Sequence, residues 1–158
     1  MDDDLTRLEE WFGQILSGLS PRERRRAAQK LGQALRRSNI ARIAANVQPD
    51  GSAMEPRKER RDRHGKVTIA AGAKMFTGLR FARRWRIDAA EDGVEIQPAT
   101  NAAAYTAAIN HFGQTKVIGR LRNGRTIRAR YPERRLLGFS GEDERLVLDI
   151  VGEMFVMK

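Results

Sequence analysis

The sequence predicts an α+β fold in which an N-terminal helical hairpin is followed by an antiparallel sheet from two β-hairpins and by a C-terminal helix. Apolar residues recur at helical spacing near both ends of the chain, a pattern typical of amphipathic helices. Between these ends, the dipeptides Asp92-Gly93 and Asn123-Gly124 each separate two segments that we expect to be strands, because such dipeptides favour two-residue hairpin turns.

Residues 1–47 are predicted to form the helical hairpin. From Asp2 to Leu19, apolar residues follow helical spacing behind a run of aspartates, and acidic side chains favour a helix amino terminus. Ser20-Pro21-Arg22-Glu23 is a capping box with proline at the first helical position, so a second helix is expected from there to about Asn46. The solvent face of this second helix is strongly basic.

Residues 48–68 change in character and are predicted to be a long, mobile, basic loop. Pro49-Asp50-Gly51 favours a turn, Pro56 follows, and an arginine-rich run covers residues 57–63. Loops of this length without secondary structure of their own are usually functional or disordered.

Residues 69–158 are predicted to form the α+β core of what we expect to be a single domain overall. A short helix is expected over residues 73–79, and residues 85–98 form the first hairpin around Asp92-Gly93. A second short helix is expected from Ala102 to His111, ended by Gly113.

The second hairpin, between residues 117 and 130, is rich in arginine and has few large apolar residues, so we expect it to project as an arm. Ser140-Gly141-Glu142-Asp143 is expected to cap the last helix, whose apolar residues form a regular stripe. The acidic start of that helix contrasts with the basic hairpin that precedes it.

Composition limits the classes of function. The chain has 158 residues and a formal net charge of +10, which favours contact with an acidic protein or with nucleic acid. It contains no cysteine, so disulfides and thiolate metal sites are excluded and a reducing cytoplasm is expected. The acidic amino terminus does not resemble a secretory signal, and no segment approaches the roughly 20 apolar residues of a membrane span, so we expect no membrane contact.

No residue pattern predicts a catalytic, cofactor or metal site. The two histidines, His64 and His111, are far apart in the sequence and lack nearby cysteines. Gly138-Phe139-Ser140-Gly141 is similar to a nucleophile elbow but is one residue short, so Ser140 is expected to be a helix cap. Glu142, Asp143 and Glu144 are better explained by the helix dipole than by a metal. We therefore expect no cofactor, no metal and no enzymatic activity.

Several segments in order resemble the tail-completion family of contractile-tailed temperate phages, also called phage virion morphogenesis proteins. Three of them carry the resemblance most clearly: Pro49-Asp50-Gly51 with the residues up to Pro56, Ala108 to Gly113, and Tyr131-Pro132-Glu133-Arg134-Arg135-Leu136-Leu137-Gly138-Phe139-Ser140. Together with the helical hairpin, the matching segments cover nearly the whole chain.

The resemblance implies a structural protein that completes or terminates the tail at its head-proximal end and enables head–tail joining. It implies a homo-oligomeric ring, with a hexamer as the expected size, and partners among the tail tube and sheath proteins and the head–tail connector proteins. The protein would be in the host cytoplasm during assembly and then in the virion tail or neck. Genome DNA would meet it transiently in the lumen of the ring.

The residues expected to contact a neighbouring subunit or the tail lie in the basic hairpin and in the segment that leads to the last helix. They are Arg120, Arg122, Arg125, Arg128, Arg134, Arg135, Leu136, Leu137, Gly138, Phe139, Glu142 and Asp143. Candidate loop contacts are Pro49, Asp50, Gly51, His111, Phe112 and Gly113. A structural interpretation stays open, in which Leu136, Leu137 and Phe139 anchor a turn in the core and His111 caps its helix.

The alternative class is a nucleic-acid-binding protein without sequence specificity, because basic helices and a basic hairpin can follow a phosphate backbone. A sequence-reading regulator would need a recognition helix, and none is identifiable in the sequence. The mass of the purified protein in solution, measured by light scattering at low and high salt with and without DNA, distinguishes the two classes.

Overall fold

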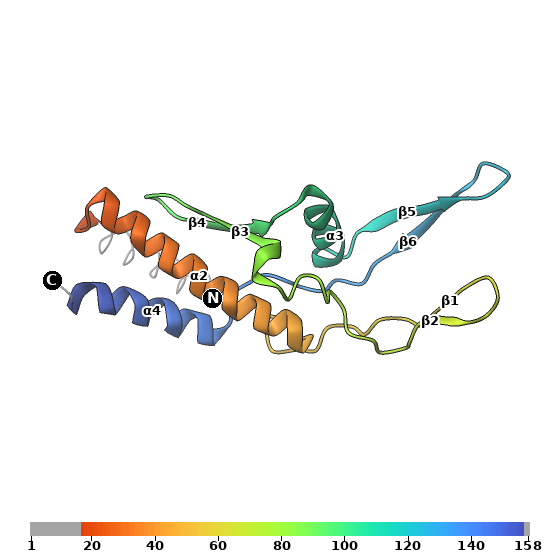
Figure 1. The fold of residues 1–158 in the computed structure, drawn as a ribbon, viewed down its shortest axis with the longest axis horizontal. Helices are drawn as coiled ribbons and strands as arrows, with labels where there is room; N and C mark the ends of the chain where they lie inside the picture. The colour runs from red at the N-terminus through yellow and green to blue at the C-terminus, as the bar shows by residue number, and fades with distance from the viewer. Residues whose placement is uncertain (1–16, 157–158) are drawn as a thin grey trace.

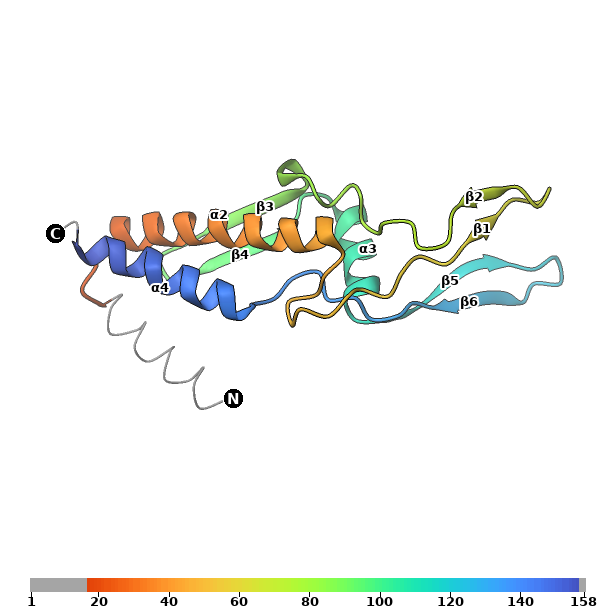
Figure 2. The same cartoon turned by 90° about the horizontal axis from the view of Figure 1, so that it is seen from below.

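The structure, a computed structural model, describes residues 17–156. Its described part is elongated (Figure 1 and Figure 2): two helices and one β-hairpin occupy one end, a short helix lies in the middle, and two β-ribbons project from the other end. The α+β class expected from the sequence is confirmed. The first predicted helix falls almost wholly on residues 1–16, outside the described residues, so the helical hairpin stays a prediction.

Helix α2 (Pro21–Ala45) begins and ends where its local sequence predicts. The Ser20 amide donates to Glu23 Oε2 over 2.7 Å, and the Glu23 amide donates to Ser20 Oγ over 3.4 Å, so the capping box is formed in both directions. At the other end Asn46 takes a left-handed conformation with φ of 56°, and its amide donates to the last carbonyls of the helix.

The hairpin of β3 (Trp85–Ala89) and β4 (Val94–Pro98) packs on α2. The two strands are antiparallel, with Ile87 opposite Ile96. Contact with the helix is so close that a Cβ on Gly32 would lie 2.6 Å from methyl groups of both Ile87 and Val94. Glycine at position 32 therefore sets the distance between helix and hairpin.

Each pair of strands in the described chain forms a ribbon of its own. Strands β5 (Thr115–Arg120) and β6 (Thr126–Arg130) form one projecting ribbon, as expected for an arm, but they do not join β3–β4 in a common sheet. Strands β1 (Arg60–Arg61) and β2 (Val67–Ile69) form another within the segment that we expected to be loop.

The short helix predicted over residues 73–79 is wrong. That segment consists of turns, with Phe76 at a φ of 54°, and only a 3-10 turn, η1 (Ala82–Arg84), follows it. Tertiary packing overrides local helix propensity here, because Leu79 is buried in the core and its carbonyl accepts the Trp85 indole N–H over 2.6 Å.

One hydrophobic core joins segments that are distant in the sequence. Helix α3 (Asn101–His111), capped by Thr100, contributes Ala107, and helix α4 (Gly141–Val156) packs along α2. The buried cluster takes one residue each from α2, the 49–56 loop, the turns before η1, β3, α3 and the segment before α4, namely Ile43, Met54, Leu79, Trp85, Ala107 and Leu136. These six residues form one cluster across segments that lie far apart in the sequence.

Candidate assembly surfaces

An apolar groove lies where the end of α3 meets the segment before α4. Its volume is about 450 Å³, and its walls include Trp85, Pro98 and Leu137. Phe112 and Phe139 stand at this groove with 66% of each residue exposed. Two phenyl rings so exposed beside an apolar groove are typical of a contact surface for another protein.

Hydrogen bonds from two backbone amides hold the two sides of this groove together. The Arg134 amide donates to the Asn110 carbonyl over 2.8 Å, and the Leu136 amide donates to His111 Nδ1 over 3.2 Å. The imidazole therefore does not cap its own helix, as we had considered, but joins α3 to the segment before α4. Burial lowers the pKa of His111, and the positive charge of Arg135 lowers it further, so the ring stays neutral and can accept this bond.

Gly113 allows the chain to leave α3 beside the same segment. Its φ is +61°, and a Cβ at this position would lie 3.0 Å from the backbone nitrogen of Glu133. Both the conformation and the space favour glycine. The backbone turn at Gly113 thus fixes the position of the exposed Phe112 ring.

Arg134 is an internal residue, although we expected it at an interface. Its guanidinium donates to the Glu55 carbonyl over 2.7 Å and to Asn110 Oδ1 over 3.2 Å, and the residue is 4% exposed. It fastens the 49–56 loop to α3 and the segment before α4. Leu136, 1% exposed, is likewise a core residue, as the structural interpretation held.

Asp143 is also internal, because its carboxylate accepts from the guanidinium of Arg42 over 2.6 Å. The Ser140 amide and hydroxyl donate to the same carboxylate oxygen, and the Asp143 amide donates to Ser140 Oγ, so Ser140 caps α4 as predicted. Arg42 also donates to Asn39 Oδ1 and to the Gly138 carbonyl. Asp143 is therefore bonded inside the subunit, whereas Glu142 is exposed.

The Pro49-Asp50-Gly51 turn packs beside the segment before α4. Asp50 Oδ1 accepts from the Ser52 amide and hydroxyl, and Gly51 has a φ of +85°. A Cβ on Gly138 would lie 2.7 Å from Pro49, so glycine permits the close contact. The Arg135 amide donates to Gln48 Oε1 over 2.9 Å, and this bond joins the turn to the segment before α4.

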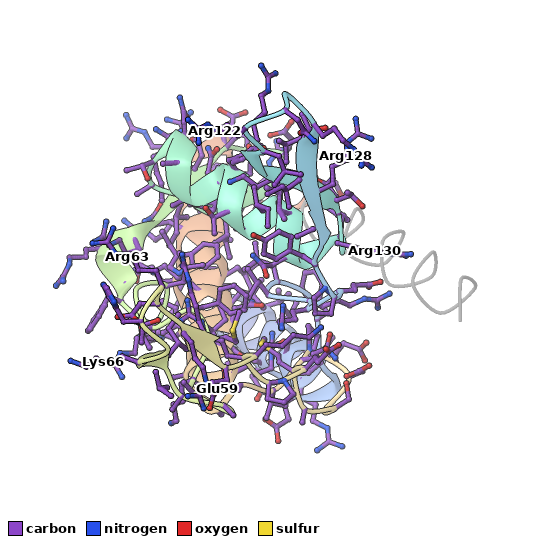
Figure 3. The ribbon with its side chains drawn as sticks, turned by 90° about the vertical axis from the view of Figure 1, so that its right-hand side faces the viewer. Glu59, Arg63, Lys66, Arg122, Arg128 and Arg130 are labelled. Atoms are coloured by element: carbon purple, nitrogen blue, oxygen red, sulfur yellow. The ribbon has the colours of Figure 1, made fainter. Side chains whose placement is uncertain are left out.

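Two basic ribbons project from the end of the molecule that lies away from the start of α2 and the end of α4 (Figure 2). In Figure 3, which faces this end, Arg63 and Lys66 of one ribbon and Arg128 and Arg130 of the other point outward. The β1–β2 ribbon and its approach carry Arg57, Lys58, Arg60, Arg61, Arg63 and Lys66, and the β5–β6 ribbon carries Lys116, Arg120, Arg122, Arg125, Arg128 and Arg130.

A cleft of about 620 Å³ lies between the two ribbons. Its lining includes Ile69, Thr106, Ile118, Ala129 and Tyr131. The sequence indicated the β5–β6 ribbon but not β1–β2, because β1 is two arginines and β2 has only three residues, too few to give a clear apolar alternation. Its detectable signal was the Asp62-Arg63-His64-Gly65 turn, where Asp62 Oδ1 accepts from the His64 and Lys66 amides.

Residues 17–156 contain no cluster of three His, Cys, Asp or Glu side chains that could hold a metal ion. Among the helices of this part of the chain, none is both long and apolar enough to cross a membrane.

Comparison with known proteins gives two matches along nearly the whole chain. The profile of the phage virion morphogenesis family matches residues 3–155. The tail completion protein S of Escherichia phage P2 is 30% identical over 149 residues, which are 94% of this chain and 95% of that protein. No solved structure matches the chain.

Proposed function

The chain belongs to the phage virion morphogenesis family and so has a role in building the phage tail, and from that premise we propose that it completes the tail at its head-proximal end. In this proposal it acts as a ring, a hexamer in our expectation, that enables the filled head to join. It meets tail tube and sheath proteins on one side and head–tail connector proteins on the other. It acts in the host cytoplasm during assembly and remains in the virion tail or neck.

The apolar groove with Phe112 and Phe139 is the observation that carries this proposal. Side chains that are 66% exposed contribute little to the stability of the subunit, but they can bury considerable apolar area against a partner. The residues that frame the groove are held by internal bonds of Arg134, His111 and Arg42. An exposed apolar surface that is supported in this way suits a structural joint.

The ring is tested by the mass of the purified protein in light scattering at low and high salt, with and without a DNA oligonucleotide. A ring-sized species that forms without DNA supports the proposal. A monomer that binds DNA tightly, with a steep dependence on salt, contradicts it and favours the nucleic-acid class.

The role in the tail is tested in the phage that carries the gene. We expect Phe139→Ser to fold normally, with an unfolding free energy within about 0.5 kcal/mol of the wild type, and to leave tails that do not join heads in electron micrographs. Ala102→Ser is a matched control, because Ala102 is exposed and lies outside the groove. Normal virions from the Phe139 variant would contradict the assignment of the groove.

Transient contact with genome DNA is a second candidate function, which the basic face of α2 favours. Arg22, Arg25, Arg26 and Lys30 line one shallow groove along this helix together with Gln29 and Gln33. Such a stripe can follow phosphates without reading bases. Arg25→Gln with Arg26→Gln should weaken binding of any DNA sequence equally, and a change that depended on sequence would contradict this role.

A further inference from the structure

We propose that the acidic β3–β4 hairpin of one copy docks against the basic β5–β6 ribbon of the next copy, and that this contact closes the ring. The inference rests on the proposed ring and names the two surfaces that meet in it. The acidic start of α4 is a weaker candidate for the partner of this ribbon, because Asp143 is bonded to Arg42 inside the subunit.

The β5–β6 ribbon has an unbalanced charge. Six bases and no acid lie between residues 115 and 130, and every one of the five arginines among them is exposed. The ribbon is a two-stranded hairpin without a third strand, an arrangement that is marginal in water by itself. Mutual repulsion of the arginines adds to that cost, so an acidic partner would stabilise the ribbon.

The β3–β4 hairpin has the complementary imbalance. The hairpin carries four exposed carboxylates, those of Asp88, Glu91, Asp92 and Glu95, against one base between residues 85 and 98, Arg86. Asp88 and Glu95 stand directly opposite each other on the two strands, where like charges are destabilising. Within residues 17–156 none of the four forms an ion pair, because the pairs found there involve other acids.

The positions of the two surfaces suit a repeating contact. The turn of β3–β4 lies toward the end of the molecule where α2 begins, and β5–β6 projects from the opposite end in both views (Figure 1 and Figure 2). One copy therefore offers both surfaces at once to two neighbours. A head-to-tail contact of this kind closes into a ring when the rotation between copies permits it.

A second copy fits the ribbon better than DNA does, because the ribbon exposes apolar side chains as well as charged ones. Val117, Ile118, Leu121 and Ile127 are each between 39% and 55% exposed. Phosphates would neutralise the arginines but would leave these apolar side chains in water, whereas a protein surface can cover both. Complementary charge also directs the encounter and fixes which surfaces meet.

The test uses two full-length variants with reversed charges. In the ribbon variant Arg120, Arg122, Arg125 and Arg128 become glutamate, and in the hairpin variant Asp88, Glu91 and Glu95 become lysine, which keeps the Asp92-Gly93 turn. Each is followed by light scattering alone and in an equimolar mixture, with circular dichroism as the check on folding. Arg37→Glu with Arg145→Glu is the control, because both arginines are exposed and belong to neither surface.

We expect each variant alone to lose the ring-sized mass, since like charges then face each other at every contact, and the mixture to regain it by alternation of the two variants. The control should assemble as the wild type does. If both variants form rings alone, or if the mixture fails to restore them, the docking is wrong while the ring stands. If the ribbon variant keeps its ring but loses binding of a DNA oligonucleotide, DNA is the partner of the ribbon. A wild-type chain that is monomeric in every condition contradicts the ring itself.

Discussion

Arg42 and Asp143 are 101 residues apart in the chain, yet Nη1 of the first and Oδ2 of the second lie 2.6 Å apart. The arginine comes from the last turn of α2, and the carboxylate, in a side chain that is 1% exposed, comes from the first turn of α4. Arg42 forms further hydrogen bonds with Ser140, Asn39 and the Gly138 carbonyl. The pair therefore fixes where α4 begins relative to α2, and with it the segment that carries Phe139.

Removal of the arginine should be costly. Arg42→Met leaves the Asp143 carboxylate buried without its charge partner, so we expect a loss of about 3 kcal/mol in the free energy of unfolding. Urea unfolding followed by circular dichroism measures it. Lys30→Met is the matched control: Lys30 joins the same two helices through Glu153 at 2.8 Å, but both side chains are at least half exposed, so the loss should be below about 1 kcal/mol. Equal losses in the two variants would contradict the central role of Arg42.

Acid should destabilise the fold through the same carboxylate. Burial by itself raises the pKa of Asp143, but hydrogen bonds from Ser38, the Ser140 backbone and Arg42 outweigh it, so the pKa lies below the usual range. A lowered folded pKa means that the carboxylate contributes stability above about pH 4, its unfolded value, and that this contribution is lost as the pH falls through the folded pKa. Asp143→Asn should be less stable at pH 7 and should lose less stability below pH 4. If the wild type and Asp143→Asn lost stability in parallel as the pH falls, Asp143 would not be the source of the acid sensitivity.

Two glycines in helices should respond to alanine in opposite directions. At Gly152, on the exposed face of α4, a Cβ meets no atom within 4 Å, so Gly152→Ala should stabilise by up to about 1 kcal/mol through helix propensity. At Gly32 the new Cβ would lie 2.6 Å from methyl groups of Ile87 and Val94, so Gly32→Ala should destabilise by about 1–3 kcal/mol. Thermal unfolding of both variants measures the difference, and stabilisation at position 32 would show that β3–β4 does not pack this closely.

Elements specified by neighbouring residues could be predicted from the sequence. Ser20 and Glu23 form their capping box within one turn of helix. Asp92-Gly93 and Asn123-Gly124 both fall in the turns of their hairpins, although the Ala90 amide bonds to the Gly93 carbonyl across Glu91-Asp92 and the Leu121 amide bonds to the Arg125 carbonyl across three residues. Helix α4 was likewise predictable from its acidic start and apolar stripe.

Features that depend on distant partners could not be predicted in this way. Arg134 and Asp143 have the sequence appearance of surface charges, and their burial depends on partners 79 and 101 residues away. The segment over residues 73–79 has helical propensity, but Leu79 and Phe76 pack on the core in turns instead. Of the residues predicted as contacts, Phe112 and Phe139 stand exposed at one groove, and their exposure follows from the tertiary positions of α3 and the segment before α4.

His111 should make the stability of the fold depend on pH near neutrality. Its Nδ1 accepts the Leu136 N–H only when the ring is neutral, and burial first, then Arg135, lowers its pKa below about 6.5, the usual value. The unfolded chain therefore binds a proton at His111 more readily than the folded chain does. The contribution of neutral His111 to stability is complete above about pH 6.5 and declines as the pH falls from that value to the folded pKa. His111→Asn offers an oxygen in place of Nδ1 and does not titrate, so the stability of this variant should vary less between pH 7 and pH 5. His111→Leu leaves the Leu136 amide unpaired, so this variant should lose about 1–3 kcal/mol of stability at both pH values. Proton NMR of a His64→Gln chain, in which His111 is the single histidine, gives the pKa directly, and a value above 6.5 would contradict the buried, accepting imidazole.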